Sequence, residues 1–259
     1  MKMKIFMLQV FFLSALSFGS NLDEPTFMVA NKSFTETHET EIEHEHSPVV
    51  NSSTTKNDHL VKKLYYDLFV RGGYDKAVRP VKNHTDQVQV YIDFTYQQVL
   101  NLNEKNQVLK SLIRMRMYWI DQFLSWKPSD YEGLTTLTVT ALDVWIPDVV
   151  VMQEIGVQDY SPRIPFITIT YAGFVSLLQP MAYETSCGVN IALFPFDVQD
   201  CEFVFLAWTF PSTKVDVVAK RNEEELNLDV SSYFITSGEW ILDRILLAKK
   251  SVSYEDVFN

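Results

Sequence analysis

Histidine is the residue whose distribution excludes most. The sequence has 259 residues and only five histidines, all of them at or before residue 84. The rest of the chain offers no imidazole as a general base, which excludes a Ser-His-Asp or Cys-His hydrolytic centre there. A glycine-rich phosphate loop and a paired-carboxylate motif are also lacking. We therefore expect no catalytic residues and no cofactor, and the protein is predicted not to be an enzyme.

Positive charge is also scarce. Lys and Arg number 22 against 33 Asp and Glu, which gives a formal net charge of −11. This balance excludes a nucleic-acid binder that relies on a basic surface. An acidic surface attracts cations, although it also serves for solubility alone. No metal site is expected at His38, His44 and His46, because nothing in that acidic segment fixes a coordination geometry.

Long apolar runs are confined to the start of the chain. Residues 1–20 begin with Met1-Lys2-Met3-Lys4, continue with an apolar stretch and end in small residues, which is the order of a secretory signal peptide. The alternative is a membrane anchor, for which about 20 apolar residues are needed. The next candidate, residues 167–183, is interrupted by polar residues, a glycine and a proline. We predict that the mature chain does not cross a membrane.

Cysteine occurs only twice, as Cys187 and Cys201. The signal peptide and three glycosylation sequons, at Asn31, Asn51 and Asn83, indicate an oxidising compartment, where two cysteines form a disulfide. Two buried free thiols are the alternative. Closing this ring of 15 residues contributes roughly 3 kcal/mol in the chain-entropy model. A domain of about 200 residues hardly needs that to fold, so we expect the ring to hold a loop in shape for an outside contact.

The sequence divides into a tail and one domain. Residues 21–57 are acidic and contain little that forms a core, which predicts a disordered tail. The domain spans residues 58–259. It opens with a helix from Asp58, an N-cap residue, because apolar residues follow at helical spacing as far as Gly72-Gly73. After residue 87 the period changes to two, which indicates strands.

Alternation and turn signals predict many short strands. In residues 110–121, Trp119 shares one face with other apolar residues, while Lys110, Arg114 and Arg116 take the opposite face. Further strands are predicted at residues 87–96, 134–142, 164–171, 173–178, 188–193, 201–208 and 214–218. The pattern predicts a mainly β fold, in which an N-terminal helix precedes an immunoglobulin-like β-sandwich of about ten strands.

The cysteine ring carries a resemblance to a known family. Cys187 and Cys201 enclose thirteen residues, with Phe194-Pro195-Phe196-Asp197 among them. This resembles the signature of the Cys-loop pentameric ligand-gated ion channels, and most of all that of the nicotinic acetylcholine receptor branch. Further landmarks follow in the family's order over residues 58–259: Tyr74-Asp75-Lys76, Val78-Arg79-Pro80-Val81, Glu104-Lys105-Asn106-Gln107, Trp119-Ile120-Asp121, Trp126 with Pro128, Asp130-Tyr131, Trp145 with Pro147-Asp148, Trp208-Thr209 and Ser237-Gly238-Glu239-Trp240.

The resemblance implies a role for the disulfide-closed loop. In the family, this loop lies at the base of the ligand-binding domain and presses on the membrane domain. By this resemblance Phe194, Pro195, Phe196 and Asp197 are coupling residues. The alternative is a rigid turn with a solvent-facing Asp197.

The resemblance also implies ligand-binding residues. A cationic amine is attracted to the face of an aromatic ring by about 0.5–2 kcal/mol for each good contact. Trp208 matches the principal-face tryptophan, and Phe210 stands where a tyrosine is common. Trp119 and Leu178 match the complementary face that a neighbouring subunit contributes. Tyr254 matches a tyrosine of the loop that closes over the ligand. For both tryptophans the alternative is a place in the core.

Other positions depart from the family pattern or match its scaffold. Met152 and Leu247 stand where agonist-binding α-type subunits carry tyrosines, and the adjacent cysteines of those subunits are absent, so the resemblance implies a non-α subunit. Residues 222–229 fall where the family has a mobile acidic loop, which either attracts cations or is a solvated charge run. The remaining tryptophans, Trp126, Trp145 and Trp240, match scaffold positions.

The resemblance finally implies a function. We expect the extracellular ligand-binding domain of an acetylcholine-receptor-like subunit, which binds a cationic neurotransmitter between the subunits of a hetero- or homopentamer at the postsynaptic plasma membrane. The last strand of the sandwich and the membrane domain are expected to be lacking, which would leave an unpaired strand edge. The alternative is a secreted binding protein or truncated subunit that sequesters ligand or modulates receptor assembly without a pore.

Overall fold

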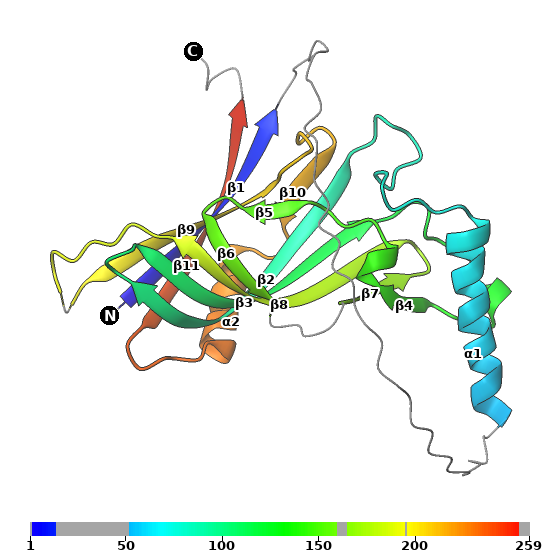
Figure 1. Ribbon diagram of the computed structural model, residues 1–259, viewed down its shortest axis with the longest axis horizontal. Helices are drawn as coiled ribbons and strands as arrows, with labels where there is room; N and C mark the ends of the chain where they lie inside the picture. The colour runs from blue at the N-terminus through cyan, green and yellow to red at the C-terminus, as the bar shows by residue number, and fades with distance from the viewer. Residues whose placement is uncertain (1, 14–51, 160–164, 195, 254–259) are drawn as a thin grey trace, which may run out of the picture.

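The structure of the protein, a computed structural model, describes residues 2–13, 52–159, 165–194 and 196–253. Eleven strands in these residues form two sheets that pack face to face (Figure 1). The mainly β prediction is therefore confirmed. Helix α1 stands at the end of the molecule opposite the disulfide-closed loop, so the two features that frame the domain lie far apart (Figure 1).

Two sheets hold all of these strands. The four-stranded sheet has the order β11 (Ile241–Ser253), β1 (Lys2–Leu13), β9 (Val198–Ala207), β5 (Val149–Val151). The seven-stranded sheet has the order β10 (Val215–Ala219), β2 (Val88–Asn103), β3 (Val108–Ile120), β8 (Phe174–Ser186), β7 (Phe166–Thr170), β4 (Thr136–Thr140), and β6 (Glu154–Asp159) also pairs with β8.

Alternation along β3 decides which side chains enter the core. Its odd positions from residue 109 to residue 119 are buried, while the even positions are half-buried on the other face. Lys110, Arg114 and Arg116 therefore lie on the polar face, as predicted. The strand expected at residues 188–193 is wrong, because that segment forms loop and turn inside the disulfide ring.

The core lies between the two sheets and is rich in aromatic rings. Phe94 of β2 stacks on Phe205 of β9 with ring centroids 6.3 Å apart, and Tyr96 meets Phe203 edge to face at 6.4 Å. The hydroxyl of Tyr96 is satisfied by the Ser111 side chain at 2.5 Å. Each buried ring contributes about 1.5–3 kcal/mol, so these pairs hold β9 firmly against β2.

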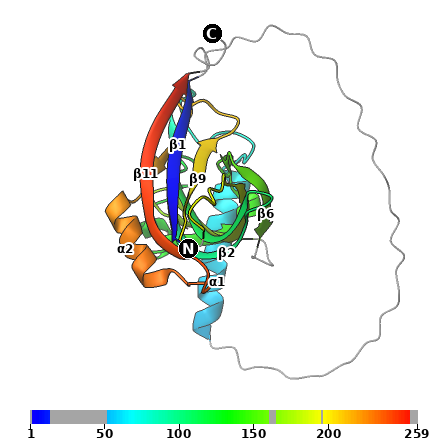
Figure 2. The same cartoon turned by 90° about the vertical axis from the view of Figure 1, so that its left-hand side faces the viewer.

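Strand β1 occupies a place that the sequence did not predict for it. It runs parallel to both β9 and β11 and lies between them (Figure 2). The strand edge that was expected to be unpaired is therefore paired in the structure. The signal-peptide assignment of residues 1–20 stays a prediction.

Helix α1 spans Ser52–Tyr65 and continues into a π-helical turn, Tyr66–Arg71, that ends at Gly72. The helical prediction is confirmed, but the helix begins at Ser52 instead of Asp58. Residues 52–57 of the predicted tail are therefore helical. Asp58 is an interior residue of α1 and not its N-cap. The segment from residue 21 to residue 51 lies outside the described residues.

Helix α2 (Glu223–Tyr233) replaces the mobile acidic loop expected at residues 222–229. Asn222 caps it: the Asn222 side chain accepts the backbone N–H of Glu225, and the Glu225 carboxylate accepts the backbone N–H of Asn222, both at 2.9 Å. Three glutamates in its first turn complement the positive end of the helix dipole. The acidic run is therefore a helix start, which explains its composition.

Candidate functional site

Trp208 follows directly after β9 on a turn whose backbone is fixed. The Trp208 N–H donates to the Asp148 carbonyl at 3.1 Å, and the next N–H, of Thr209, donates to the Asp148 carboxylate at 2.6 Å. Trp208 as a whole residue is 71% exposed. An indole face held on a fixed turn and open to solvent suits a cation. The alternative of a core position for Trp208 is wrong.

Phe210 is less available than Trp208. It is half-buried and packs on the core, and the guanidinium carbon of Arg79 lies 5.9 Å from its ring centroid. Arg79 is fixed in turn by hydrogen bonds to backbone carbonyls, among them those of Asp86 and Lys214. A cation from the same chain therefore already contacts the Phe210 ring.

The capping segment is described only in part. Tyr254 lies outside the described residues. Leu247 of β11 is half-buried, and its N–H donates to the Glu223 carboxylate at 3.1 Å. Met152, which stands at the other position where α-type subunits carry a tyrosine, is exposed.

Trp119 is a core residue. It is 0% exposed and meets Trp145 edge to face, with ring centroids 6.2 Å apart. Because a ring with no exposed face cannot contact a ligand unless the core opens, the prediction of Trp119 as a ligand-binding residue is wrong. The scaffold role predicted for Trp126, Trp145 and Trp240 agrees with their burial.

Leu178 lies on the opposite face of the same sheet from Trp119. Residues directly opposite in an antiparallel pair share a face, and Leu178 is opposite Arg116 while Trp119 is opposite Val175. Leu178 is 45% exposed. We call the half-buried Arg114 and Arg116, together with the exposed Leu178, the arginine face. The two predicted complementary-face residues therefore do not come together, and arginines take the place beside Leu178.

A buried carboxylate holds one side of the arginine face. Asp93 of β2 is only 7% exposed, and its two oxygens lie 3.5 Å from Arg116 Nη1 and 2.5 Å from Arg221 Nε. Sequence reasoning missed Asp93 and Arg221, because 128 residues separate them along the chain. Only the register of β2 and the start of α2 bring them together.

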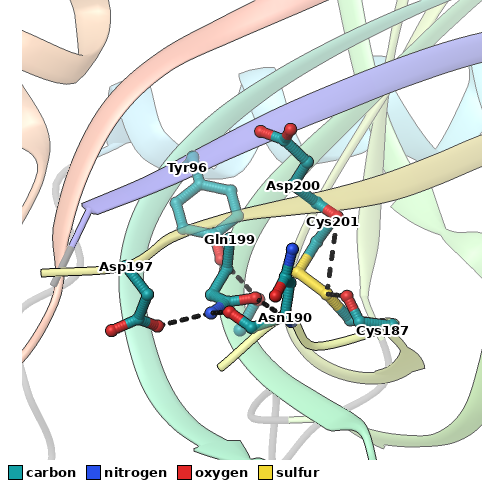
Figure 3. Close-up of a disulfide and its surroundings, with 9 residues drawn as sticks. Tyr96, Cys187, Asn190, Asp197, Gln199, Asp200 and Cys201 are labelled. Atoms are coloured by element: carbon teal, nitrogen blue, oxygen red, sulfur yellow. Dashed lines mark hydrogen bonds between the residues drawn. A yellow bond between two sulfur atoms is a disulfide. The ribbon is translucent and has the colours of Figure 1, made fainter. Parts of the chain in front are cut away.

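Cys187 and Cys201 form the predicted disulfide (Figure 3). The loop that the disulfide closes presents apolar side chains to solvent, and Phe194 and Phe196 are exposed, the latter at 87%. Pro195 lies outside the described residues. An exposed apolar tip indicates a contact surface, which favours the coupling role predicted for Phe194 and Phe196.

Asp197 has a different place from these two phenylalanines. It is 2% exposed and accepts a hydrogen bond from the amide of Gln199, which also bridges to the Asn190 backbone through two hydrogen bonds of 2.8 Å (Figure 3). The alternative of a solvent-facing Asp197 is therefore wrong, whereas its coupling role stays a prediction. The carboxylate instead fixes the shape of the loop from inside.

The remaining predicted positions concern modification, metals and membranes. Asn83 is exposed, with its side-chain oxygen accepting the Thr85 N–H at 3.2 Å, whereas Asn31 and Asn51 lie outside the described residues. Within the described ranges, no group of three or more His, Cys, Asp or Glu residues is arranged for a metal ion. None of the helices in those ranges has the length and apolarity that a membrane crossing requires.

A buried polar cluster supports the tryptophan pair of the core. The Tyr74 hydroxyl donates to the Asp121 carboxylate at 2.6 Å and accepts the Trp145 N–H at 3.0 Å. The same carboxylate accepts the N–H groups of Phe123 and Leu124. Burial raises the pKa of both Tyr74 and Asp121, and the hydrogen bond from Tyr74 lowers that of Asp121.

Replacing Tyr74 with phenylalanine is expected to lower the free energy of unfolding at pH 7 by about 1–3 kcal/mol, because buried groups lose their partner. The raised pKa of Asp121 means that its contribution to stability is fully present below its unfolded value of 3.8 and is lost as pH rises through the folded value. Without the Tyr74 bond the folded pKa of Asp121 rises further. The deficit of Tyr74→Phe should therefore shrink as pH falls from 7 towards 4.

Urea unfolding at several pH values measures this deficit. Tyr131→Phe is the matched control, because it removes a 3.0 Å bond to Asp67 at a less buried position. We expect its effect to stay within about 0.5 kcal/mol. A Tyr74→Phe deficit that is equal at pH 7 and pH 4 would contradict the charge-assisted bond.

The fold and these positions together define a class of receptor domain. Residues 61–258 match the family described as neurotransmitter-gated ion-channel ligand binding domain. The chain belongs to this family. This is a family of receptors and not of enzymes, which agrees with the prediction that the protein is not an enzyme.

Curated relatives come from two branches of receptors. The 5-hydroxytryptamine receptor 3A of Mus musculus is 36% identical over 70% of this chain and 37% of its own length. Neuronal acetylcholine receptor subunit beta-3 of Gallus gallus is 30% identical over 73% of this chain and 39% of its own. Acetylcholine receptor subunit beta-like 1 of Drosophila melanogaster is 36% identical over 69% and 33%, respectively. The chain thus spans well under half the length of these relatives.

Proposed function

We propose that this domain binds a small cationic neurotransmitter between subunits and couples its capture to a membrane domain through the disulfide-closed loop. The carrying observation is the exposed indole of Trp208 on a turn fixed by Asp148. Because the backbone of this turn is already fixed, less conformational entropy is lost when the ring contacts a ligand, and the cation–π attraction contributes to affinity. Membership of a neurotransmitter-gated family supports the same reading.

Two surfaces of different chemistry support a site between subunits. Trp208 follows a strand of the four-stranded sheet, whereas the arginine face belongs to the seven-stranded sheet. The arginine face repels an ammonium group and attracts hydrogen-bond acceptors. We propose that the amine of the ligand lies against Trp208 of one subunit, while an acceptor group of the ligand faces the arginine face of the next.

Assembly and coupling follow from the same proposal. A hetero- or homopentamer would bring Trp208 of one subunit to the arginine face of its neighbour. Phe194 and Phe196 would carry the contact with a membrane domain, because their exposed rings gain by burial. We further propose that the domain faces the outside of the cell, with signal cleavage and glycans on Asn31, Asn51 and Asn83. Enzymatic deglycosylation followed by mass measurement tests the glycans.

Binding and assembly can be tested together on the full chain from a secretory host, alone or co-expressed with an α-type acetylcholine receptor subunit. Acetylcholine and 5-hydroxytryptamine are the probes, and light scattering gives the mass of the assembly. We expect saturable binding of at least one probe that appears only with the oligomer. Oligomers that bind neither probe would contradict the ligand class, and a monomer that binds as tightly as the oligomer would contradict the interface.

A further inference from the structure

Helix α2 connects two parts of the domain that belong to different sheets. Asp229 of α2 and the preceding Arg221 contact β2, while Glu223 and Asn227 of α2 contact β11. The capping box at Asn222 and the burial of Leu226 fix the helix between them. A short helix anchored at both contacts transmits displacement as a rigid body.

The contact with β2 centres on Arg221. Its Nε pairs with the buried Asp93, its Nη2 donates to the Phe94 carbonyl at 2.7 Å, and its Nη1 lies 3.0 Å from an oxygen of Asp229 in α2. Asp229 also accepts the Thr95 hydroxyl at 2.8 Å. Asp93 is the carboxylate that Arg116 of the arginine face contacts on its other oxygen. The arginine face is therefore joined to α2 by consecutive charged contacts.

The contact with β11 uses side chains of α2 as substitutes for a neighbouring strand. The Asn227 amide donates to the Ile245 carbonyl at 2.8 Å and accepts the Ile245 N–H at 2.7 Å. Two residues further along, the Leu247 N–H donates to the Glu223 carboxylate. These bonds satisfy backbone groups that a strand edge otherwise leaves open. They also fix the strand that leads towards residue 254.

From these contacts we infer that Arg221 is a positioning residue that makes α2 a strut between the arginine face and β11. A ligand or subunit that contacts Arg116 competes for its bond to Asp93, and the change passes through Arg221 and α2 to β11. The two faces of one subunit would then respond to each other. The functional part of this inference rests on the proposed function, whereas the strut itself does not.

The strut predicts that a change at Arg221 loosens β11. In Arg221→Gln of the full chain without any ligand, the amides of Ile245 and Leu247 should exchange hydrogen at least about tenfold faster, since they lose the order of their α2 partners. Hydrogen–deuterium exchange resolved by NMR measures both sites. Amides of β3 at Met115 and Met117 serve as the internal reference, because global destabilisation speeds them as well.

Lys110→Gln is the matched control variant. It removes one positive charge and a 2.8 Å ion pair with Glu184 from the seven-stranded sheet, away from α2. It should leave the exchange rates of the Ile245 and Leu247 amides unchanged. If Arg221→Gln does not fold, Arg221→Lys keeps the charge and loses the forked contacts, and the same exchange decides. Unchanged β11 amides, or acceleration equal to that of β3, would overturn the strut.

A second arm separates this inference from the proposed function. Acetylcholine or 5-hydroxytryptamine is added to wild-type chain in its assembled form, and exchange at Ile245 and Leu247 is measured again. Slower exchange on binding supports coupling through α2. Binding that leaves both amides unchanged contradicts the coupling, while the proposed function stands. If Arg221→Gln speeds exchange in β11 but neither probe binds, the strut stands and the proposed function is contradicted.

Discussion

Trp119→Ala is expected to lower the free energy of unfolding by about 3–5 kcal/mol, the range for deleting a large aromatic side chain from a packed core. Trp119 is fully buried, and its ring contacts Trp145 edge to face. The indole nitrogen has no hydrogen-bond partner among the described residues, so the loss comes from the cavity and from lost burial. Urea unfolding at 25 °C, with the midpoint and slope fitted separately, measures it.

Two further variants separate packing from ligand contact at this strand end. Trp119→Phe keeps part of the ring volume and should lose less than the alanine variant. Ile120→Ala changes the next residue, which points to the other face and is exposed, so its effect should stay within about 0.5 kcal/mol. A stable Trp119→Ala variant with weakened amine binding would restore Trp119 to the ligand site and remove it from the core.

The difference between Trp119 and Leu178 shows what the sequence could predict. Alternation along β3 placed Trp119 with the apolar odd positions and the arginines with the even ones, and the structure confirms both. The register of β8 against β3 was not readable, because it depends on the pairing of segments far apart in the chain. Without it, the sequence could not show that Leu178 lies opposite Arg116. A face can be predicted from period two, but its neighbours across strands require the fold.

The predictions of a solvent-facing Asp197 and of a mobile acidic loop at residues 222–229 are wrong for a related reason. The sequence predicted the disulfide and a loop held in shape for an outside contact. Whether a carboxylate in that loop faces outward depends on Gln199, whose side-chain amide donates a hydrogen bond to the buried Asp197. The run of glutamates after Asn222 was interpreted by charge alone, although an Asn followed three residues later by a Glu is the signature of a helix start. The local signal for the helix start is therefore present in the sequence. The pairing of Arg221 with Asp93 and with Asp229 of α2 is not, because it depends on the fold.

A residue of the candidate ligand surface can be predicted from the sequence when its surroundings come from residues nearby in the chain. Trp208 directly follows a strand, so its exposure depends on where β9 ends, which the Cys201 strand pattern nearly located. Phe210 lies two residues later and is contacted by Arg79, a residue from the opposite end of the domain sequence. Consequently Trp208 can be tested as a single ring, whereas a change at Phe210 also releases a cation.

Trp208→Ala is expected to weaken binding of acetylcholine or 5-hydroxytryptamine roughly 10- to 30-fold, which corresponds to the loss of about 1.4–2 kcal/mol from one good cation–π contact. The ring is exposed, and its turn is fixed through backbone bonds to Asp148, so stability should change by less than about 0.5 kcal/mol. Titration calorimetry on the assembled chain measures affinity, and urea unfolding measures stability. Trp208→Phe should fall between wild type and alanine, because a smaller ring attracts the cation less.

Phe166→Ala is the matched control for this experiment, because it deletes another exposed aromatic ring, from β7 of the seven-stranded sheet. It should leave affinity for both probes unchanged. Should Trp208→Ala and Phe166→Ala weaken binding equally, the amine would be attracted by exposed rings in general, without a defined site. Should Trp208→Ala leave affinity intact while it lowers stability, the ring would be a packing residue whose exposure ends on assembly, and the cation would have to be held elsewhere.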